Sequence, residues 1–142
     1  MIDNQAGADM SYASRTGAVL FAHGVERVAS FYSVALGLTE ANRDADHILL
    51  ESPGFQLVVH RIPGTGAPTA DATLATSRRA AAAFKPVFFV PDIARLRVAV
   101  EKHGGVMEPP DKEWSFDGTM VCDAQDPEGN VIQFRAVPGG SR

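Results

Sequence analysis

In the first half of the chain, the spacing of apolar residues changes from one segment to the next. Residues 17–23 form a short apolar run, which predicts a buried strand. Apolar side chains then recur at helical spacing up to Gly37, a residue typical of the position after a helix. Residues 38–42, 47–51 and 55–61 read as strands separated by turn residues. The predicted order is strand, helix, strand, strand, strand.

The second half repeats this order. Residues 85–90 form another apolar strand, and Asp92 is a suitable N-cap for a helix that ends before Gly104. Three further strands are predicted, over 106–108, 118–123 and 131–137. The two halves match in the order of their elements, in the positions of apolar residues within each element and in the glycines that follow the helices. The chain therefore contains an internal duplication of a βαβββ module.

The boundaries follow from the repeat. We expect one α+β domain over residues 16–138, made of module one (16–61), a Pro/Gly/Thr-rich linker (62–83) and module two (84–138). Residues 1–15 are small and polar without periodicity, and are expected to form a flexible N-terminal tail.

Composition narrows the function classes. The net charge of −4 comes without a Lys/Arg cluster, so nucleic acid is not an expected partner. No apolar run reaches the ~18 residues of a membrane span, so a membrane is not expected either. The single cysteine, Cys122, excludes an intrachain disulfide and is expected to pack in the core. With no signal-peptide pattern at the start, the expected location is cytoplasmic.

Two segments carry a resemblance to a known family. Residues 126–134 (DPEGNVIQF) resemble the turn and last strand of the vicinal oxygen chelate superfamily, and residues 24–38 resemble the entry to its first helix. That superfamily includes glyoxalase I, extradiol dioxygenases, fosfomycin-modifying transferases and bleomycin-binding resistance proteins. The resemblance covers about residues 16–138. It implies a curved eight-stranded mixed sheet, or cup, with the helices outside, and a homodimer.

The resemblance also implies a divalent metal, bound by the first and last strands of each module. The corresponding positions here are Gly17, Val58, Lys85 and Gln133. Glycine and valine offer no side-chain donor, lysine is positively charged, and glutamine offers one neutral oxygen. His60 shares a face with Val58 but does not complete a site. We therefore expect no metal and no other cofactor.

Alternation along the strands predicts an apolar cup with a few polar groups. It suits a ligand with an aromatic or aliphatic body and an anionic or carbonyl end. Trp114 is placed in an inserted loop, as a cap over the ligand or a cover for the core edge. For His60, Lys85 and Arg135, a purely structural role at the rim of the cup stays open. For Gln133, a role as a buried amide with hydrogen-bond partners stays open. The expected ligand-binding residues are Phe21, Val58, His60, Lys85, Phe89, Trp114, Gln133 and Arg135.

Three functions remain open. The favoured interpretation is a metal-independent protein that binds a small organic molecule, as bleomycin resistance proteins do. The second is an isomerase or hydratase that uses His60 or Lys85 as an acid–base group. The third is a divalent-metal lyase or dioxygenase with ligands elsewhere. No catalytic residue is assigned, and His47 and His103 are interpreted as solvent-exposed turn and helix-end residues.

Overall fold

A computed structural model describes residues 14–64 and 78–139. The tail predicted for residues 1–15 lies outside the described residues except for Ser14 and Arg15, and much of the predicted linker 62–83 also lies outside them. Within the described ranges, no helix has the length and apolar character needed to cross a membrane.

Module one contains four strands and one helix. Its strands form a sheet in the order β1-β4-β3-β2, in which β1 is parallel to β4 and the other neighbours are antiparallel. The elements are β1 (Thr16–Ala22), α2 (Val25–Leu36), β2 (Thr39–Arg43), β3 (His47–Ser52) and β4 (Phe55–Arg61).

Module two repeats this topology with additions. Its sheet has the order β5-β9-β8-β6, with β5 parallel to β9, and β7 pairs with β8 off this path. The elements are β5 (Val87–Phe89), α3 (Ile93–Lys102), β6 (Val106–Met107), the 3-10 turn η2 (Pro110–Lys112), β7 (Trp114–Phe116), β8 (Thr119–Gln125) and β9 (Val131–Ala136).

The α+β class and the two βαβββ modules are confirmed, with differences in detail. The described strands form sheets of four and five strands, and β1 and β5 are not hydrogen-bonded into one eight-stranded sheet. The loop predicted around Trp114 is wrong, because this residue begins β7. Asp117 and Gly118 both have positive φ, at 48° and 73°, which gives the two-residue turn that joins β7 to β8. The strand predicted from Lys85 begins only at Val87.

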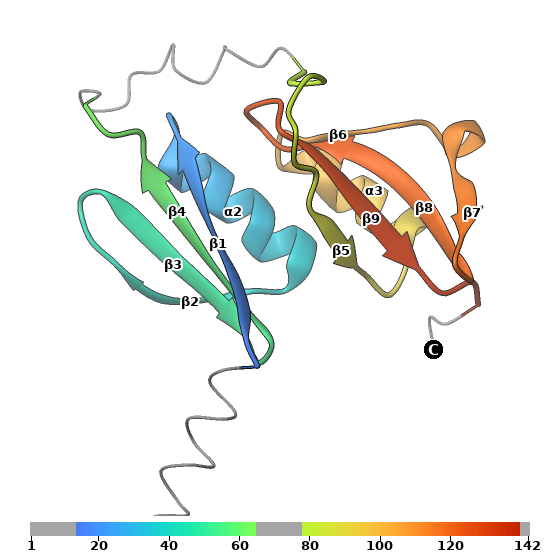
Figure 1. Cartoon of the computed structure of the whole chain (residues 1–142), viewed down its shortest axis with the longest axis horizontal. Helices are drawn as coiled ribbons and strands as arrows, with labels where there is room; N and C mark the ends of the chain where they lie inside the picture. The colour runs from blue at the N-terminus through green and yellow to red at the C-terminus, as the bar shows by residue number, and fades with distance from the viewer. Residues whose placement is uncertain (1–13, 65–77, 140–142) are drawn as a thin grey trace, which may run out of the picture.

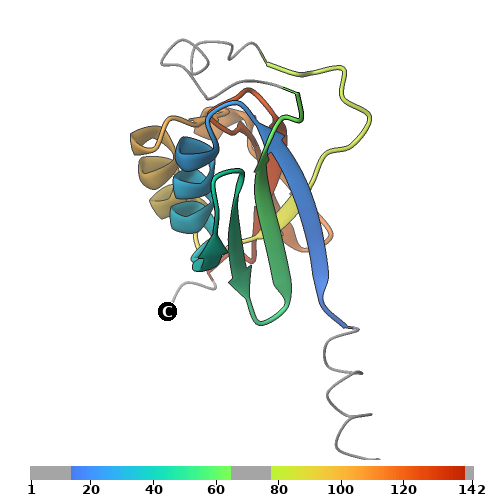
Figure 2. The same ribbon diagram turned by 90° about the vertical axis from the view of Figure 1, so that its left-hand side faces the viewer.

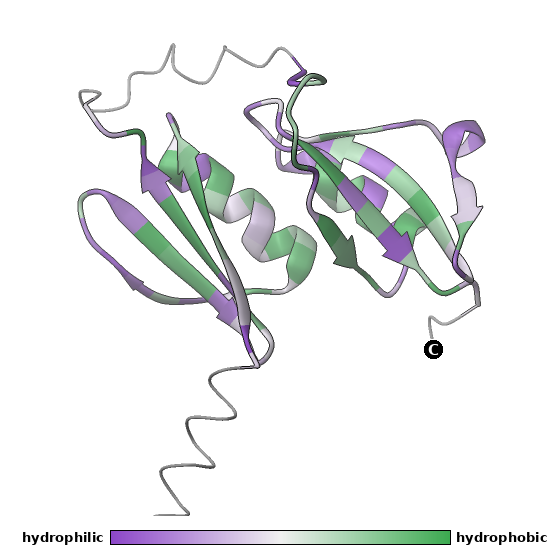
Figure 3. Ribbon diagram, viewed as in Figure 1, coloured by the Kyte–Doolittle hydropathy of each residue, from purple (hydrophilic) through white to green (hydrophobic). Residues whose placement is uncertain are grey.

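Each module places its helix on one face of its sheet and leaves the other face open. Figures 1 and 2 show α2 and α3 side by side behind the two sheets, whose open faces point to the same side. Side-chain alternation explains this arrangement. Ile132 and Phe134 of β9 are fully buried toward α3, whereas Gln133 and Arg135 point to the open face, which gives β9 its alternating hydropathy in Figure 3.

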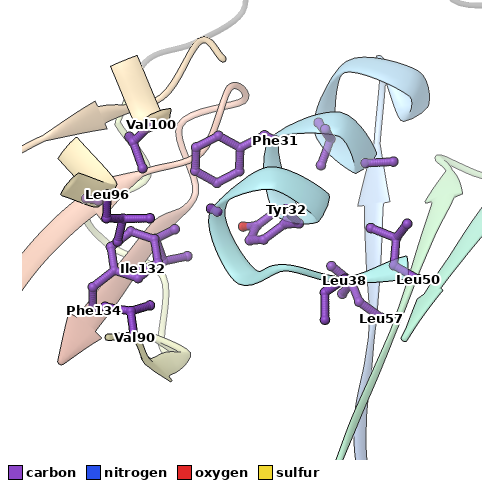
Figure 4. Close-up of a cluster of buried hydrophobic side chains, with 14 of the residues drawn as sticks. Phe31, Tyr32, Leu38, Leu50, Leu57, Val90, Leu96, Val100, Ile132 and Phe134 are labelled. Atoms are coloured by element: carbon purple, nitrogen blue, oxygen red, sulfur yellow. The ribbon is translucent and has the colours of Figure 1, made fainter. Parts of the chain in front are cut away.

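The helices join the modules through an apolar contact. Phe31 of α2, fully buried, reaches toward Val100 of α3 (Figure 4). A Cβ atom at Gly105 would overlap the Phe31 ring, so this position has to be glycine for the ring to fit. Phe88 of β5 adds edge contacts to Tyr32 and Phe55 of module one, at centroid distances of 6.1 and 5.7 Å.

The turn between β8 and β9 joins the modules through polar contacts. The Glu128 carboxylate, 1% exposed, accepts hydrogen bonds from the backbone N–H groups of His23 (3.0 Å) and Gly24 (2.7 Å) at the N-terminus of α2. Both N–H groups precede the first helical residue, Val25, and the N-cap residue Gly24 has no side chain that could cap the helix itself. A carboxylate of module two therefore holds the backbone that leads into the helix of module one.

Asp126 holds the same turn in shape. Its Oδ1 accepts hydrogen bonds from the backbone N–H groups of Glu128 and Asn130, at 2.9 and 3.0 Å. Its Oδ2 accepts a hydrogen bond of 2.8 Å from the hydroxyl of Tyr32 on α2. Burial raises the pKa of Tyr32 well above its usual range, and the Asp126 carboxylate raises it further. The DPEGN turn is thus structural, and it also docks the two modules.

We expect Glu128→Ala to lower the free energy of unfolding by about 2–3 kcal/mol, because two buried N–H groups lose a charged acceptor. Urea denaturation followed by circular dichroism measures this change. Glu101→Ala, at an exposed position of α3, is the matched control and should change stability little. Equal stability of the two variants would show that the Glu128 contact does not hold the modules together.

Candidate functional site

A chain of polar side chains crosses the open face of module two. The Lys85 ammonium donates to Asp123, with N–O distances of 3.1 and 3.3 Å. The Gln133 amide nitrogen donates to Asp123 Oδ1 (3.0 Å), and Arg135 Nε donates to Gln133 Oε1 (2.8 Å). This chain links β8 to β9 and to the residue that precedes β5 by two positions.

Aromatic rings surround the Arg135 end of this chain. The guanidinium carbon lies 4.8 Å from the centroid of Phe116 and 6.0 Å from that of Phe89. Trp114 and Arg135 both pair with Val121 of β8, from opposite sides, so all three occupy one row across the sheet. The aromatic side chains on this face remain exposed, with exposed fractions of 71% for Phe89, 53% for Phe116 and 40% for Trp114.

The open face of module one carries a second aromatic group. Phe21 meets the His60 ring edge-on at 5.8 Å, and His60 stacks on His47, its cross-strand partner, at 6.4 Å. His60 Nδ1 lies 2.6 Å from the carbonyl oxygen of Arg61, which can only accept a hydrogen bond. In neutral His60 the proton therefore sits on Nδ1, and Nε2 presents a lone pair.

A cavity of about 730 Å³ lies between the two modules. Residues 16–20 of β1 form one wall, and residues 86–89 at β5 form the other. Tyr32 and Leu36 of α2 close one end, beside Phe88. Among the predicted ligand-binding residues, only Phe89 lines this inter-module cavity. Phe89 also lies against Arg135, so it connects the cavity to the polar chain on module two.

The fold of this chain is shared with proteins of known structure. No protein-family model matches the chain, and no curated protein matches it in sequence. A glyoxalase/bleomycin resistance protein/dioxygenase family enzyme from Burkholderia phytofirmans PsJN superposes with a TM-score of 0.65 at 15% identity, covering 85% of this chain and 96% of that one. The chain has the fold of the vicinal oxygen chelate superfamily.

Two more solved structures with the vicinal oxygen chelate fold superpose on this chain. The fosfomycin resistance protein FosX from Mesorhizobium loti gives a TM-score of 0.60 at 10% identity, over 85% of this chain and 89% of its own. The bleomycin resistance determinant encoded on transposon Tn5 gives 0.52 at 18% identity, over 87% and 98%. Identities this low establish the fold and leave the function to the site itself.

The donor set does not fit the divalent metal that the vicinal oxygen chelate fold commonly holds. Gln133 is the one uncharged donor among the four corresponding positions, and its oxygen already accepts from Arg135. Lys85 places an ammonium group beside Asp123, where a metal would need the carboxylate. Gly17 and Val58 contribute no donor. Within residues 14–64 and 78–139, no group of three or more His, Cys, Asp or Glu side chains is placed to hold a metal ion.

The structure divides the predicted site residues into two groups. Phe21, Val58 and His60 lie on the open face of module one. On module two lie Lys85, Phe89, Trp114, Gln133 and Arg135.

The residues predicted from the sequence to line the site do not include Asp123, Phe116 or His47. Alternation along β8 and β3, applied as it was to β9 and β4, would have placed Asp123 and His47 on the open faces. The Asp117–Gly118 pair is a strong hairpin signal and would have turned Phe116 inward beside Arg135. His47 is also half-buried rather than fully exposed, and its ring nitrogens contact Asp44 and Asn42.

Proposed function

We propose that this protein binds a small, largely apolar organic molecule in the inter-module cavity, without a divalent metal. The observation that carries the proposal is the cavity of about 730 Å³, bounded by apolar side chains on both modules. This volume lies within the range of roughly 300–1,000 Å³ typical of small-molecule sites. The vicinal oxygen chelate fold, shared with resistance proteins, agrees with such a role.

The exposed side chains around the cavity support the same proposal. Phe84 is 81% exposed and Val19 57% exposed, and both line it. Large apolar groups gathered in this way mark a surface that covers a ligand or a partner. Each such ring or branched side chain gains about 1.5–3 kcal/mol when it is fully removed from water, which favours an apolar occupant.

An isomerase or hydratase is the second candidate, and His60 supports it. The fixed Nδ1–H of neutral His60 leaves Nε2 as a base on the open face. Lys85 is the weaker acid–base candidate, because its ammonium group is already hydrogen-bonded to Asp123. We place this activity second because the His60 ring is oriented by a backbone carbonyl and not by a carboxylate that would form an acid–base pair with it.

A second copy of the chain is the proposed partner. Among the described strands, β1 and β5 are at sheet edges, and the open face of module one exposes apolar side chains such as Phe21 beside the edge of β1. A symmetric dimer would cover these side chains and the strand edges at once. The cavity would then lie next to the dimer interface.

Ala18→Trp should block the cavity, because Ala18 lines it from the edge strand β1. With the neutral fluorescent probe N-phenyl-1-naphthylamine, we expect the dissociation constant to rise about tenfold, since a filled cavity loses most apolar contacts. Fluorescence titration measures it. Ala94→Trp, at an exposed position of α3, is the matched control and should bind the probe like the original protein. Unchanged binding in Ala18→Trp would contradict the proposed cavity.

Metal removal should leave probe binding unchanged. We expect untagged protein dialysed against EDTA to bind N-phenyl-1-naphthylamine as tightly as protein supplied with Zn²⁺, Mn²⁺ or Fe²⁺, because Gly17, Val58, Lys85 and Gln133 together offer one neutral oxygen donor. Elemental analysis of the purified protein accompanies the titration. A stoichiometric metal whose removal weakens binding, and whose content falls in Gln133→Ala, would refute metal independence.

Light scattering should report a dimer at micromolar concentration. Phe21→Glu, on the open face of β1, should shift the protein toward the monomer because it places a charge in the proposed interface. Val98→Glu changes an apolar side chain of similar exposure on α3 and should leave the dimer intact. A monomeric original protein, or equal effects of both variants, would refute this interface.

A further inference from the structure

We infer that the ligand carries a single carboxylate, bound by Arg135, next to a planar aromatic body. This inference rests on the proposed function and names the ligand class for the same site. It is built from the polar chain on module two, whose hydrogen bonds each have a fixed direction.

Gln133 is the residue that sets this direction. Asp123 can only accept, so the Gln133 side that faces it has to be the NH₂ group. The Gln133 oxygen consequently faces Arg135 and accepts from its Nε–H. Because Gln133 is only 5% exposed, flipping its amide would leave buried groups unpaired at both ends. Gln133 is therefore a positioning residue for the Arg135 guanidinium.

The terminal amino groups of Arg135 are left for a ligand. Within the described residues, the hydrogen bond of Arg135 is the one from Nε to Gln133, and no carboxylate pairs with it. Phe116 and Phe89 flank the guanidinium at 4.8 and 6.0 Å. With Nε engaged and the plane flanked by rings, the two terminal NH₂ groups form a fork that matches two carboxylate oxygens.

The charges on the open face of module two favour a ligand with one negative charge. Asp123 neutralises Lys85 at 3.1 Å, so the positive charge without a carboxylate partner on this face belongs to Arg135. One carboxylate neutralises one guanidinium. A phosphate dianion would carry surplus charge into a surface whose remaining neighbours are aromatic rings, where an unpaired charge is costly.

The exposed rings select the rest of the ligand. Phe89 and Phe116 flank Arg135, and Trp114 lies in the same row across the sheet; the exposures of the three rings are 71, 53 and 40%. A planar aromatic body that carries its carboxylate directly on the ring can contact these faces while its oxygens reach the fork. Through Phe89, the same body can extend into the inter-module cavity.

The test compares a carboxylate with a neutral ligand of the same shape. Isothermal titration calorimetry is carried out with 2-naphthoate and 2-naphthamide on the full chain. We expect the carboxylate to bind about tenfold more tightly, the size of one partly exposed charge-assisted interaction. Arg135→Met should reduce this preference to within about twofold while 2-naphthamide binding is retained.

Three further variants make the result specific. Arg135→Lys keeps the charge without the fork and should lose most of the preference. Gln133→Met should lose part of the preference without weakening 2-naphthamide, an effect that a purely structural role would not produce. Arg95→Met, on the exposed surface of α3, should bind both ligands like the original protein. Circular dichroism confirms that each variant is folded.

The outcomes separate the two proposals. Equal affinity of both naphthyl ligands for the original protein would overturn the carboxylate inference and leave the proposed function standing. A preference that survives in both Arg135→Met and Arg135→Lys would also overturn it, because the carboxylate would then bind elsewhere. If neither naphthyl ligand nor N-phenyl-1-naphthylamine binds, the proposed function itself fails.

Discussion

The buried carboxylate of Glu128 is the interaction on which the arrangement of the two modules depends. It accepts hydrogen bonds across the module boundary from the backbone N–H groups of His23 and Gly24, which lead into α2, at 3.0 and 2.7 Å. Asp126 accepts from the Tyr32 hydroxyl about two turns further along the helix. These contacts fix α2 against the β8–β9 turn at several points along its length. Since α2 carries the sheet of module one with it, the same contacts fix the spacing between β1 and β5 and therefore the inter-module cavity.

The two modules differ at the starts of their helices. In module two, Asp92 caps α3 through its own side chain, which accepts from the backbone N–H of Arg95 at 3.1 Å. Gly24 occupies the matching position in module one and has no side chain to do so. α2 therefore has no side-chain cap of its own, and the backbone that leads into it is held by a carboxylate from the other half of the chain. The start of α3 is closed within its own module, whereas the start of α2 is held by a contact that couples the two modules.

Most of the fold could be predicted from local pattern, whereas the site depended on contacts between distant strands. The spacing of apolar residues and the glycine after α2 were sufficient to predict the elements of both modules. In a helix or strand, the buried positions recur with the period of that element. The role of Glu128 could not be read in this way, since its partners at His23 and Gly24 lie in the other module. The apolar residues after Lys85 predict a strand that includes it, but pairing with β9 begins only at Val87. Asp123 lies opposite Gln133, so alternation along β8 predicts the same open face for both residues.

Asp123 also shows how this surface departs from metal chemistry. A carboxylate on the open face of a vicinal oxygen chelate fold is the kind of donor that a hard divalent cation needs. Here its two oxygens accept from the Lys85 ammonium and the Gln133 amide. A metal ion at Asp123 would have to displace both donors from these oxygens, and neither Gly17 nor Val58 supplies a side-chain donor in their place. The Lys85 ammonium already brings a positive charge to this carboxylate, and the pair is neutral. The Arg135 guanidinium then remains as a cation of this face that, within the described residues, has no carboxylate partner, which is the reason why the proposed ligand is an anion.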